Sequence, residues 1–419
     1  MKLTVEGLKD TAGWKKAGVV LPAYDIAAVR AKTAAAPTWL HFGAGNIFRM
    51  FIGGIADSLL SQGLAQTGIV CAETFSFDII DEIYRPYDNL VLGVTLKPDG
   101  SVTKQVIASL TEAIRSTPAY TGEWERMKEI FAAPSLQMIS FTITEKGYAL
   151  KNASGSYFPY IESDLQQGPD CAKSAMAQVT ALLSHRFKSG ALPLAVVSMD
   201  NCSHNGEKLR SSVTAMAQEW QKKDLVSADY VAWLSDETKV SFPWSMIDKI
   251  TPRPNEKVAE LLKKDGYEDT GLIVTKKGTY CSTFVNAEEP QYLVIEDTFP
   301  NGRPPLEKAG VYFTDRETVN KVEKMKVCTC LNPLHTALAL SGCLLGFKLI
   351  CDEMKDDDLR KMVKILGYKE GLPVVVDPKI IEPKKFIDEV ITKRLPNPFM
   401  PDTPQRIATD TSQKLSIRF

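Results

Sequence analysis

The stretch TWLHFGAGNIFRMFIGGIADSLLSQG, residues 38–63, decides the fold. Its first five residues form an apolar run typical of a strand, Gly43 and Gly45 follow, and apolar residues then recur at helical intervals over 46–63. The run GIVCAE, residues 68–73, is typical of a second buried strand. This order of strand, helix and strand predicts a βαβ unit at the start of a parallel sheet.

The turn at Gly43 and Gly45 is suited to hold a pyrophosphate, because glycines let the backbone curl tightly and the amides of a helix N-terminus bind phosphate. Glu73 ends the second strand, somewhat later than the usual ~20 residues after the glycines for an acid that binds ribose. Phe48 replaces the third glycine of the fingerprint and would space helix and strand further apart. We predict a dinucleotide site that prefers NAD, since a carboxylate would repel a 2′-phosphate. A glycine turn without ligand and a solvated strand end stay open as alternatives.

The rest of the chain divides into two parts. Strand-like runs at 136–144 and 192–200 extend the predicted sheet. From about residue 300 the sequence becomes Pro/Gly-rich and then mainly helical and charged. The predicted fold is α/β, with a Rossmann-like, NAD-binding N-terminal domain over 1–285. A mostly α-helical C-terminal domain over 286–419 is expected to complete the substrate and catalytic site.

Composition narrows the function class. The chain has 419 residues, 44% of them hydrophobic, so it can bury a large core. Its 50 basic and 51 acidic side chains give no general attraction to nucleic acid or anionic lipid. The start lacks a basic stretch before a long apolar run, and the longest apolar segment, 337–347, is too short to span a bilayer. We therefore expect a cytoplasmic protein whose partners are small molecules, not nucleic acid or a membrane.

Several competing chemistries lack their motifs. The eight cysteines show no C-x-x-C spacing, and we interpret Cys328 and Cys330 as small, mostly buried strand residues. No Gly-Lys pair forms a Walker A loop, and no Tyr is followed four positions later by Lys. The four histidines and the cysteines do not form a zinc ligand set, so no metal is expected. If the protein moves hydride, a side chain must handle the alcohol proton.

The segment KVCTCLNPLH, residues 326–335, offers such side chains. Asn332 followed by Pro333 predicts a helix start with asparagine as the cap. His335 then lies in the first helical turn, where the helix dipole favours a neutral imidazole that can hydrogen-bond a hydroxyl. A buried lysine at position 326 could take and return the hydroxyl proton. A plain cap, a core histidine and a surface lysine remain the alternatives.

Five segments, in the same order, resemble the polyol-specific long-chain dehydrogenases/reductases, which include mannitol 2-dehydrogenase, fructuronate reductase and tagaturonate reductase. The resemblance covers nearly the whole chain, and two later segments also look like family segments. The five are GAGNIFR (43–49), TITEKGY (142–148), SMDNCSHNG (198–206), FPWSMIDKITP (242–252) and KVCTCLNPLH (326–335), and the later two are RLPNP (394–398) and DTSQK (410–414).

The resemblance implies a metal-free site between the two domains. Lys326 would be the general acid/base, Asn201 and Asn332 would donate hydrogen bonds to the oxyanion, and His335 would position the substrate. His204 would be a structural contact near Asn201. The residues implied for NAD binding are Gly43, Gly45, Asn46, Ile47, Phe48, Arg49, Glu73, Thr144 and Glu145. Those implied for substrate binding are Asp248, Arg394, Asn397 and Lys414.

The sequence departs from the family pattern twice. Lys326 lies six residues before Asn332 where the family has five, a difference that a one-residue bulge in 327–330 could absorb. The chain also ends earlier than its relatives, so the C-terminal domain is expected to be shortened or cut.

The expected reaction interconverts a secondary alcohol and its ketose. We favour D-mannonate and D-fructuronate, because Arg394 and Lys414 lie in segments that could hold a carboxylate. Mannitol 2-dehydrogenase and tagaturonate reductase are the alternatives. A non-catalytic sensor that binds NAD and a sugar acid represents a different class.

Overall fold

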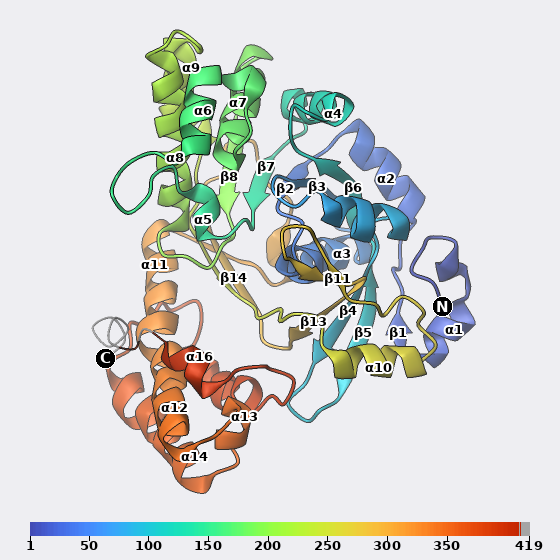
Figure 1. Ribbon diagram of the computed structural model, residues 1–419, viewed down its shortest axis with the longest axis vertical. Helices are drawn as coiled ribbons and strands as arrows, with labels where there is room; N and C mark the ends of the chain where they lie inside the picture. The colour runs from blue at the N-terminus through green and yellow to red at the C-terminus, as the bar shows by residue number, and fades with distance from the viewer. Residues whose placement is uncertain (410, 412–419) are drawn as a thin grey trace.

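The structure is a computed structural model that describes residues 1–409 and 411. Figure 1 shows a part built on sheets, which contains the N-terminus, and a helical part at the opposite end of the long axis. The last strand ends at Thr314 and the helical part begins at Arg316. The predicted mixed fold is confirmed, while the division at 285/286 stays a prediction. Lys414 and most of the segment 410–414 lie outside the described residues.

A six-stranded sheet of parallel strands forms the centre of the N-terminal part, with strand order β6-β3-β2-β7-β8-β9. The order reverses between β2 and β7, and ligands of open α/β sheets bind at such a switch point, at the carboxyl ends of the strands. The predicted strands at 38–42, 68–73, 136–144 and 192–200 are all confirmed. The strands are Trp39–Phe42 (β2), Ile69–Glu73 (β3), Leu110–Arg115 (β6), Met138–Phe141 (β7), Leu194–Ser198 (β8) and Val240–Ser241 (β9).

Helices cover both faces of this sheet, which is why its central strands β2, β3, β7 and β8 are mostly apolar and buried. Leu40 and Phe42 pack in one core cluster and Trp39 in another, because successive strand residues point to opposite faces. A group of helices from α6 to α9 lies beside β7 and β8 (Figure 1). The helices of this part are Thr11–Lys16 (α1), Ile26–Ala35 (α2), Gly53–Ser61 (α3), Thr121–Ala132 (α4), Glu145–Tyr148 (α5), Pro159–Gln167 (α6), Ala175–Lys188 (α7), Asn205–Gln221 (α8), Ala228–Ser235 (α9) and Glu256–Lys264 (α10).

Further strands, which the sequence did not predict, connect the sheet to the helical part. One sheet has the order β1-β5-β4-β13 and another the order β10-β14-β15, while β11 and β12 form a hairpin. Together they place the ends of β10 and β13 beside the helical part. These strands are Val19–Val20 (β1), Val91–Leu96 (β4), Val102–Ile107 (β5), Ser245–Asp248 (β10), Ile273–Val274 (β11), Tyr280–Cys281 (β12), Phe284–Glu288 (β13), Tyr292–Glu296 (β14) and Tyr312–Thr314 (β15).

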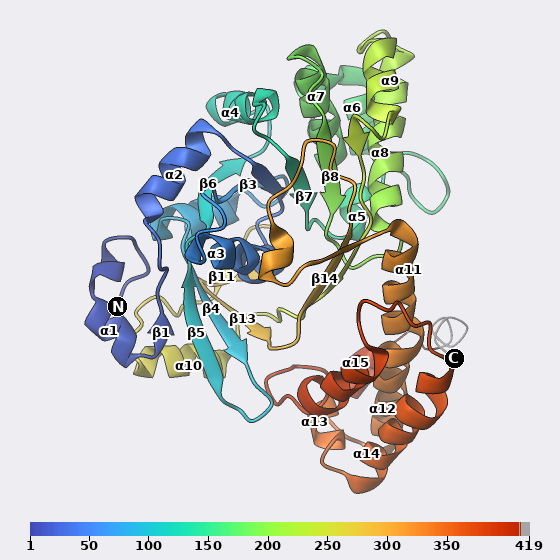
Figure 2. The same ribbon diagram turned by 180° about the vertical axis from the view of Figure 1, so that it is seen from behind.

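The C-terminal part is built around α12, which packs against α13, α14 and α16 (Figures 1 and 2). Its helices are Arg316–Met325 (α11), Asn332–Leu345 (α12), Ile350–Glu353 (α13), Asp357–Lys364 (α14), Pro383–Glu389 (α15) and Pro404–Ala408 (α16). Short 3₁₀ or π-helical segments complete the chain: Gly7–Lys9 (η1), Phe48–Ile52 (η2), Ile80–Tyr84 (η3), Arg85–Tyr87 (η4), Pro169–Cys171 (η5), Leu306–Ala309 (η6), Lys326–Cys330 (η7), Ile365–Gly371 (η8), Leu372–Val374 (η9) and Val390–Arg394 (η10).

The interpretation of Cys328 and Cys330 as strand residues is wrong. The segment Lys326–Cys330 is a π-helical turn between α11 and α12, with Cys330 buried and Cys328 exposed. A π-helical turn holds more residues than an α-helical one. The extra residue between Lys326 and Asn332 is therefore taken up by helical winding, where the sequence suggested a bulge.

The helical run Arg316–Leu345 is, within the described chain, the one helix long and apolar enough to cross a membrane by length and composition. The short apolar segment 337–347 alone did not indicate this. Because 44% of its most apolar window is buried within the protein, the run equally fits the core helix of a domain, which passes the same test.

Glu353 at the end of α13 is a fully buried carboxyl group, and neither of its oxygens has a hydrogen-bond partner among the described residues. A Cβ on Gly342 of α12 would lie 1.9 Å from Glu353 Oε1, so only glycine leaves room for this side chain. Burial raises the pKa of Glu353 to about 8. The folded protein therefore holds a proton that the unfolded chain releases near pH 4.5.

We expect the folding stability of the protein to fall as the pH rises from about 5 to about 8, and Glu353→Gln to remove this loss. The variant should be more stable than the original chain at pH 8.5 by on the order of 3 kcal/mol, since one pKa unit corresponds to about 1.4 kcal/mol. Urea unfolding at pH 5.5 and 8.5 measures the difference. Asp352→Asn, at an exposed neighbour, is the control. If the free energies of unfolding of Glu353→Gln and the original chain differed by the same amount at both pH values, the expectation would be contradicted.

Candidate active site

The turn after β2 leaves space for a phosphate group. Gly43 has φ +110°, and a Cβ there would lie 2.4 Å from the Thr142 carbonyl oxygen. A Cβ on Gly45 would meet no atom within 4 Å. The backbone is thus open at the start of the helix, where amides can bind an anion. These residues fit the pyrophosphate of a dinucleotide.

The Glu73 carboxylate is bound by four backbone amides. Oε2 accepts from Ala44 at 2.9 Å, which ties the end of β3 to the glycine turn. Oε1 accepts from the next three amides, those of Thr74, Phe75 and Ser76, at 2.8–3.1 Å. Glu73 therefore shapes the loop that follows β3. Its predicted contact with a ribose stays a prediction.

The side chains of Phe48 and Arg49 are fully buried. Phe48, at the position of the third glycine, begins the π-helical turn η2, and its ring stacks on His41 with centroids 4.1 Å apart. Arg49 donates from Nη2 to the Thr283 carbonyl at 3.1 Å. Because both side chains are buried, a cofactor could contact these two residues only at their backbone atoms. Asn46 and Ile47, just before the turn, are half-buried.

Thr144 and Glu145 lie in the loop after β7. Thr144 has φ +66°, and its amide donates to Asp200 Oδ1 at 2.9 Å. Glu145 begins α5 and pairs with Lys208, with more than half of its side chain exposed. Both follow β7 at the carboxyl edge of the sheet, and their contact with NAD stays a prediction.

Lys326 is the centre of a buried polar cluster. Its Nζ donates to Asn201 Oδ1 and to the Ile247 carbonyl, both at 3.1 Å, and lies 3.2 Å from Asp248 Oδ1. The ammonium thus donates two hydrogen bonds and forms an ion pair with Asp248. Because the Asn201 oxygen receives the lysine, the Asn201 amide Nδ2 is left as a donor for a substrate oxygen. Predicted residues from three distant segments, 201, 248 and 326, thus meet at one point.

Lys326 is followed by a row of side chains with alternating charge, Asp248, Arg394 and Glu288, which keeps Asp248 in place beside it. Arg394 Nη1 donates to both oxygens of Asp248, at 2.9 and 3.1 Å, and Nε lies 2.9 Å from Glu288 Oε2. Burial alone would raise the pKa of Asp248, but Lys326 and Arg394 outweigh it and lower that pKa. Burial raises the pKa of Glu288 to about 7. The sequence analysis missed Glu288, because an acid at the end of an apolar strand gives no local signal.

His335 and Asn332 lie on the first turn of α12. Leu331 precedes the helix, Asn332 is its first residue, and no side chain caps this end, so the prediction of Asn332 as the cap is wrong. The cap geometry changes because the π-helical turn leads directly into α12. Asn332 is half-buried. His335 Nε2 lies 3.6 Å from Asp402 Oδ2.

A cavity lies between the helical part and the end of β10, lined by His335, Arg394, Asn397 and Asp402 together with apolar side chains. Asn397 is fully buried and donates from Nδ2 to the Leu96 carbonyl at 3.1 Å, which holds the helical part against β4. No described residue accepts a hydrogen bond from Arg394 Nη2, so this group is the donor that remains for a ligand.

His204 contacts the Trp244 ring, and its role as a structural contact stays a prediction. It precedes α8 with φ +52°, and its ring lies 4.5 Å from the Trp244 ring. The contact fixes the turn that carries Asn201.

A Rossmann sheet with an open glycine turn, joined to a helical part that supplies a buried lysine, defines the class of NAD(P)-type oxidoreductases. The sequence matches the mannitol dehydrogenase Rossmann domain over residues 37–308 and the mannitol dehydrogenase C-terminal domain over 318–419. The chain belongs to the mannitol dehydrogenase family, and it is an oxidoreductase of polyol or sugar-acid hydroxyl groups.

The relatives extend beyond this chain. It is 54% identical over 421 residues to the D-mannonate oxidoreductase of Thermotoga maritima, a match that covers all of this chain and 77% of that protein. A solved D-sorbitol dehydrogenase is 27% identical with a TM-score of 0.82, covering 96% of this chain and 77% of that one. Mannitol 2-dehydrogenase of Pseudomonas fluorescens, solved with NAD and D-mannitol, is 26% identical with a TM-score of 0.76, covering 99% and 78%.

Proposed function

We propose that the protein is an NAD-dependent oxidoreductase that interconverts D-mannonate and D-fructuronate. The observation that carries the proposal is the buried Lys326 ammonium, held 3.1–3.2 Å from Asn201, Ile247 and Asp248, with Asp248 in turn paired with Arg394, which lines the cavity. The identity to a D-mannonate oxidoreductase over the whole chain supports the acid substrate.

The open turn at Gly43 and Gly45 would hold the pyrophosphate of NAD, as the free space at Gly45 supports. When bound, NAD accepts the hydride from the carbinol carbon, and NADH returns it in the opposite direction. The protein itself has to bind the sugar and move the hydroxyl proton.

Lys326 would perform the proton transfer. In the reductive direction its ammonium gives a proton to the oxygen of the reacting carbonyl, and in the oxidative direction the neutral amine takes the proton of the hydroxyl. The Asn201 Nδ2 and the Asn332 amide would donate to the same oxygen as charge develops on it. Loss of one such donor typically costs about 10²–10³ in rate.

The substrate carboxylate would lie in the cavity near His335 and Arg394. Arg394 Nη1 donates to Asp248 and Nε faces Glu288 in an ion pair, so we assign Nη2 to the substrate. We infer a single charge-assisted hydrogen bond from Arg394 to the carboxylate.

We expect kcat/KM for D-mannonate to exceed that for D-mannitol by on the order of 10²-fold, because the polyol leaves Arg394 Nη2 without its charged partner. The measurement is NADH formation from NAD⁺ with D-mannonate, D-altronate, D-mannitol and D-arabinitol in parallel. Turnover of D-altronate in place of D-mannonate would indicate a tagaturonate reductase. Turnover of D-mannitol alone would contradict the acid substrate, and NADH binding without any turnover would favour the sensor.

A further inference from the structure

The hairpin formed by β11 and β12 contacts the βαβ unit of residues 38–73 and the loop that follows it, although about two hundred residues separate them in the sequence (Figure 1). At its tip, the Lys276 amide donates to Asp78 Oδ2 at 2.9 Å. The Lys277 ammonium lies 5.1 Å from the centre of the Phe75 ring. Phe75 and Asp78 both belong to the loop after β3, so the tip lies over that loop.

The base of the hairpin is held by the same unit. Arg49, which follows the glycine turn, donates from a fully buried guanidinium to the Thr283 carbonyl, two residues after β12. The hairpin is therefore fixed at its base by the helix after the glycine turn and at its tip by the loop after β3. Because it is attached at both ends, the hairpin forms one wall of the space beside the carboxyl end of β3. This fold places the adenosine ribose in that space.

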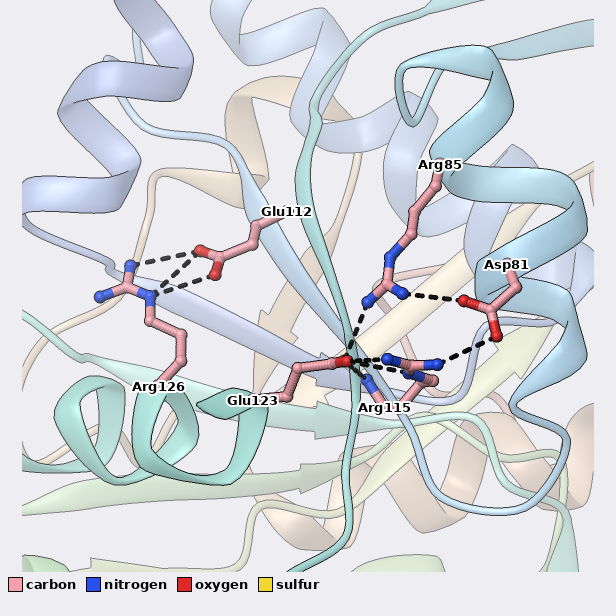
Figure 3. A network of polar contacts seen from close by, with 6 residues as sticks. All are labelled: Asp81, Arg85, Glu112, Arg115, Glu123 and Arg126. Carbon is pink, nitrogen blue, oxygen red and sulfur yellow. Dashed lines mark hydrogen bonds and ion pairs between the residues drawn. The ribbon is translucent and has the colours of Figure 1, made fainter. Parts of the chain in front are cut away.

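The tip brings two lysines, Lys276 and Lys277, to this wall. Arg115 pairs with Glu73 in the sheet register, but its guanidinium is bound to Glu123 and Asp81 (Figure 3). Lys277 forms no ion pair with a described carboxylate. Lys276 has a weak one, 3.7 Å from Asp78, with its side chain 88% exposed.

The other groups of the wall are suited to adenosine. The Phe75 ring is 64% exposed, and an exposed aromatic ring can stack on a base. The Glu73 charge is already met by four backbone amides, so it opposes a nearby phosphate less than a free carboxylate would. Lysine is a compact charge suited to phosphate.

We infer that the hairpin tip, residues 275–279, forms a wall of the adenosine site, with Lys276 and Lys277 placed to bind a 2′-phosphate. The protein then binds NADP(H) as well as NAD(H). This inference rests on the proposed function, since it requires a nicotinamide dinucleotide at the glycine turn.

Isothermal titration of the full chain with NADP⁺ and with NAD⁺ tests the inference. In the double variant K276E/K277E we expect NADP⁺ affinity to fall about 10- to 100-fold and NAD⁺ affinity to change less than about threefold, because only NADP⁺ carries the extra phosphate. The double variant K263E/K264E makes the same charge change on two exposed lysines of α10 and should leave both affinities unchanged. K276A/K277A, which adds no negative charge, should lower NADP⁺ affinity less.

The outcomes separate this inference from the proposed function. If the original chain binds NAD⁺ but not NADP⁺, the hairpin assignment is overturned while the proposed function stands. If neither nucleotide binds, both are overturned. Equal losses for NAD⁺ and NADP⁺ in K276E/K277E, or a loss of NADP⁺ affinity in K263E/K264E, would also overturn the role of the tip lysines.

Discussion

Lys326→Ala should lower kcat for D-mannonate oxidation by about 10²–10⁴-fold, the range expected when a general acid/base is removed. The reason is geometric as well as chemical. Lys326 Nζ is the buried donor that faces Asn201 Oδ1, so alanine removes both the proton carrier and the group that orients this amide. NAD⁺ affinity should change less than about threefold, because the polar contacts of Lys326 are with Asn201, Ile247 and Asp248 and not with the glycine turn.

Lys324→Ala is the matched control for this variant. Lys324 lies two residues earlier, at the end of α11, and is exposed. It should keep full activity. Steady-state rates from pH 6 to 10, with NAD⁺ titrations of both variants, provide the comparison. If Lys326→Ala keeps the rate and pH profile of the original chain, the proton-transfer assignment fails. A large loss in Lys324→Ala would move that assignment to the other lysine.

Gly43→Ala should disrupt the cofactor turn, lowering NAD⁺ affinity at least about 100-fold and the folding free energy by about 2–4 kcal/mol. Two costs act together. Residue 43 has φ +110°, where side chains are rarely tolerated, and the added Cβ would lie 2.4 Å from the Thr142 carbonyl oxygen. The turn would have to shift away from β7. Urea unfolding and nucleotide titration measure the two effects separately.

Gly45→Ala separates cofactor binding from folding. Its Cβ would enter open space, so stability should be nearly unchanged. NAD⁺ affinity should still fall, because the methyl group fills the room left for the pyrophosphate. Equal loss of stability in both variants would contradict this reading of the turn, and so would full NAD⁺ affinity in Gly45→Ala.

The part of the fold that the sequence predicted depends on short-range patterns. The βαβ unit of residues 38–73 was recognisable because apolar strands, a glycine turn and helical periodicity follow one another directly. Leu209, Val213, Met216 and Trp220 recur at helical spacing, and all four side chains are buried on one face of α8. Patterns of this kind depend on local geometry, so they can be recognised from the order of the residues alone.

The parts that were missed depend on long-range contacts or on winding. Alternation in KVCTC suggested a strand, but its neighbours α11 and α12 impose a π-helical turn. Glu288 joins the site only because β13 pairs with β4 and brings it to Arg394. Glu73 was recognised as a strand-end acid, yet its four amide partners follow from the loop conformation. None of these contacts produces a periodic pattern in the sequence.

The buried bonds that cross from the helical part to the sheets have a mechanical consequence. Arg394 is paired with Asp248 and Glu288, and Asn397 donates to the Leu96 carbonyl, so the two parts are fastened at separate points. Swinging them apart would strip buried charges of their partners, which typically costs about 3–5 kcal/mol for each broken pair. We therefore expect the two parts to resist hinge opening, because such a motion would break all of these contacts at once.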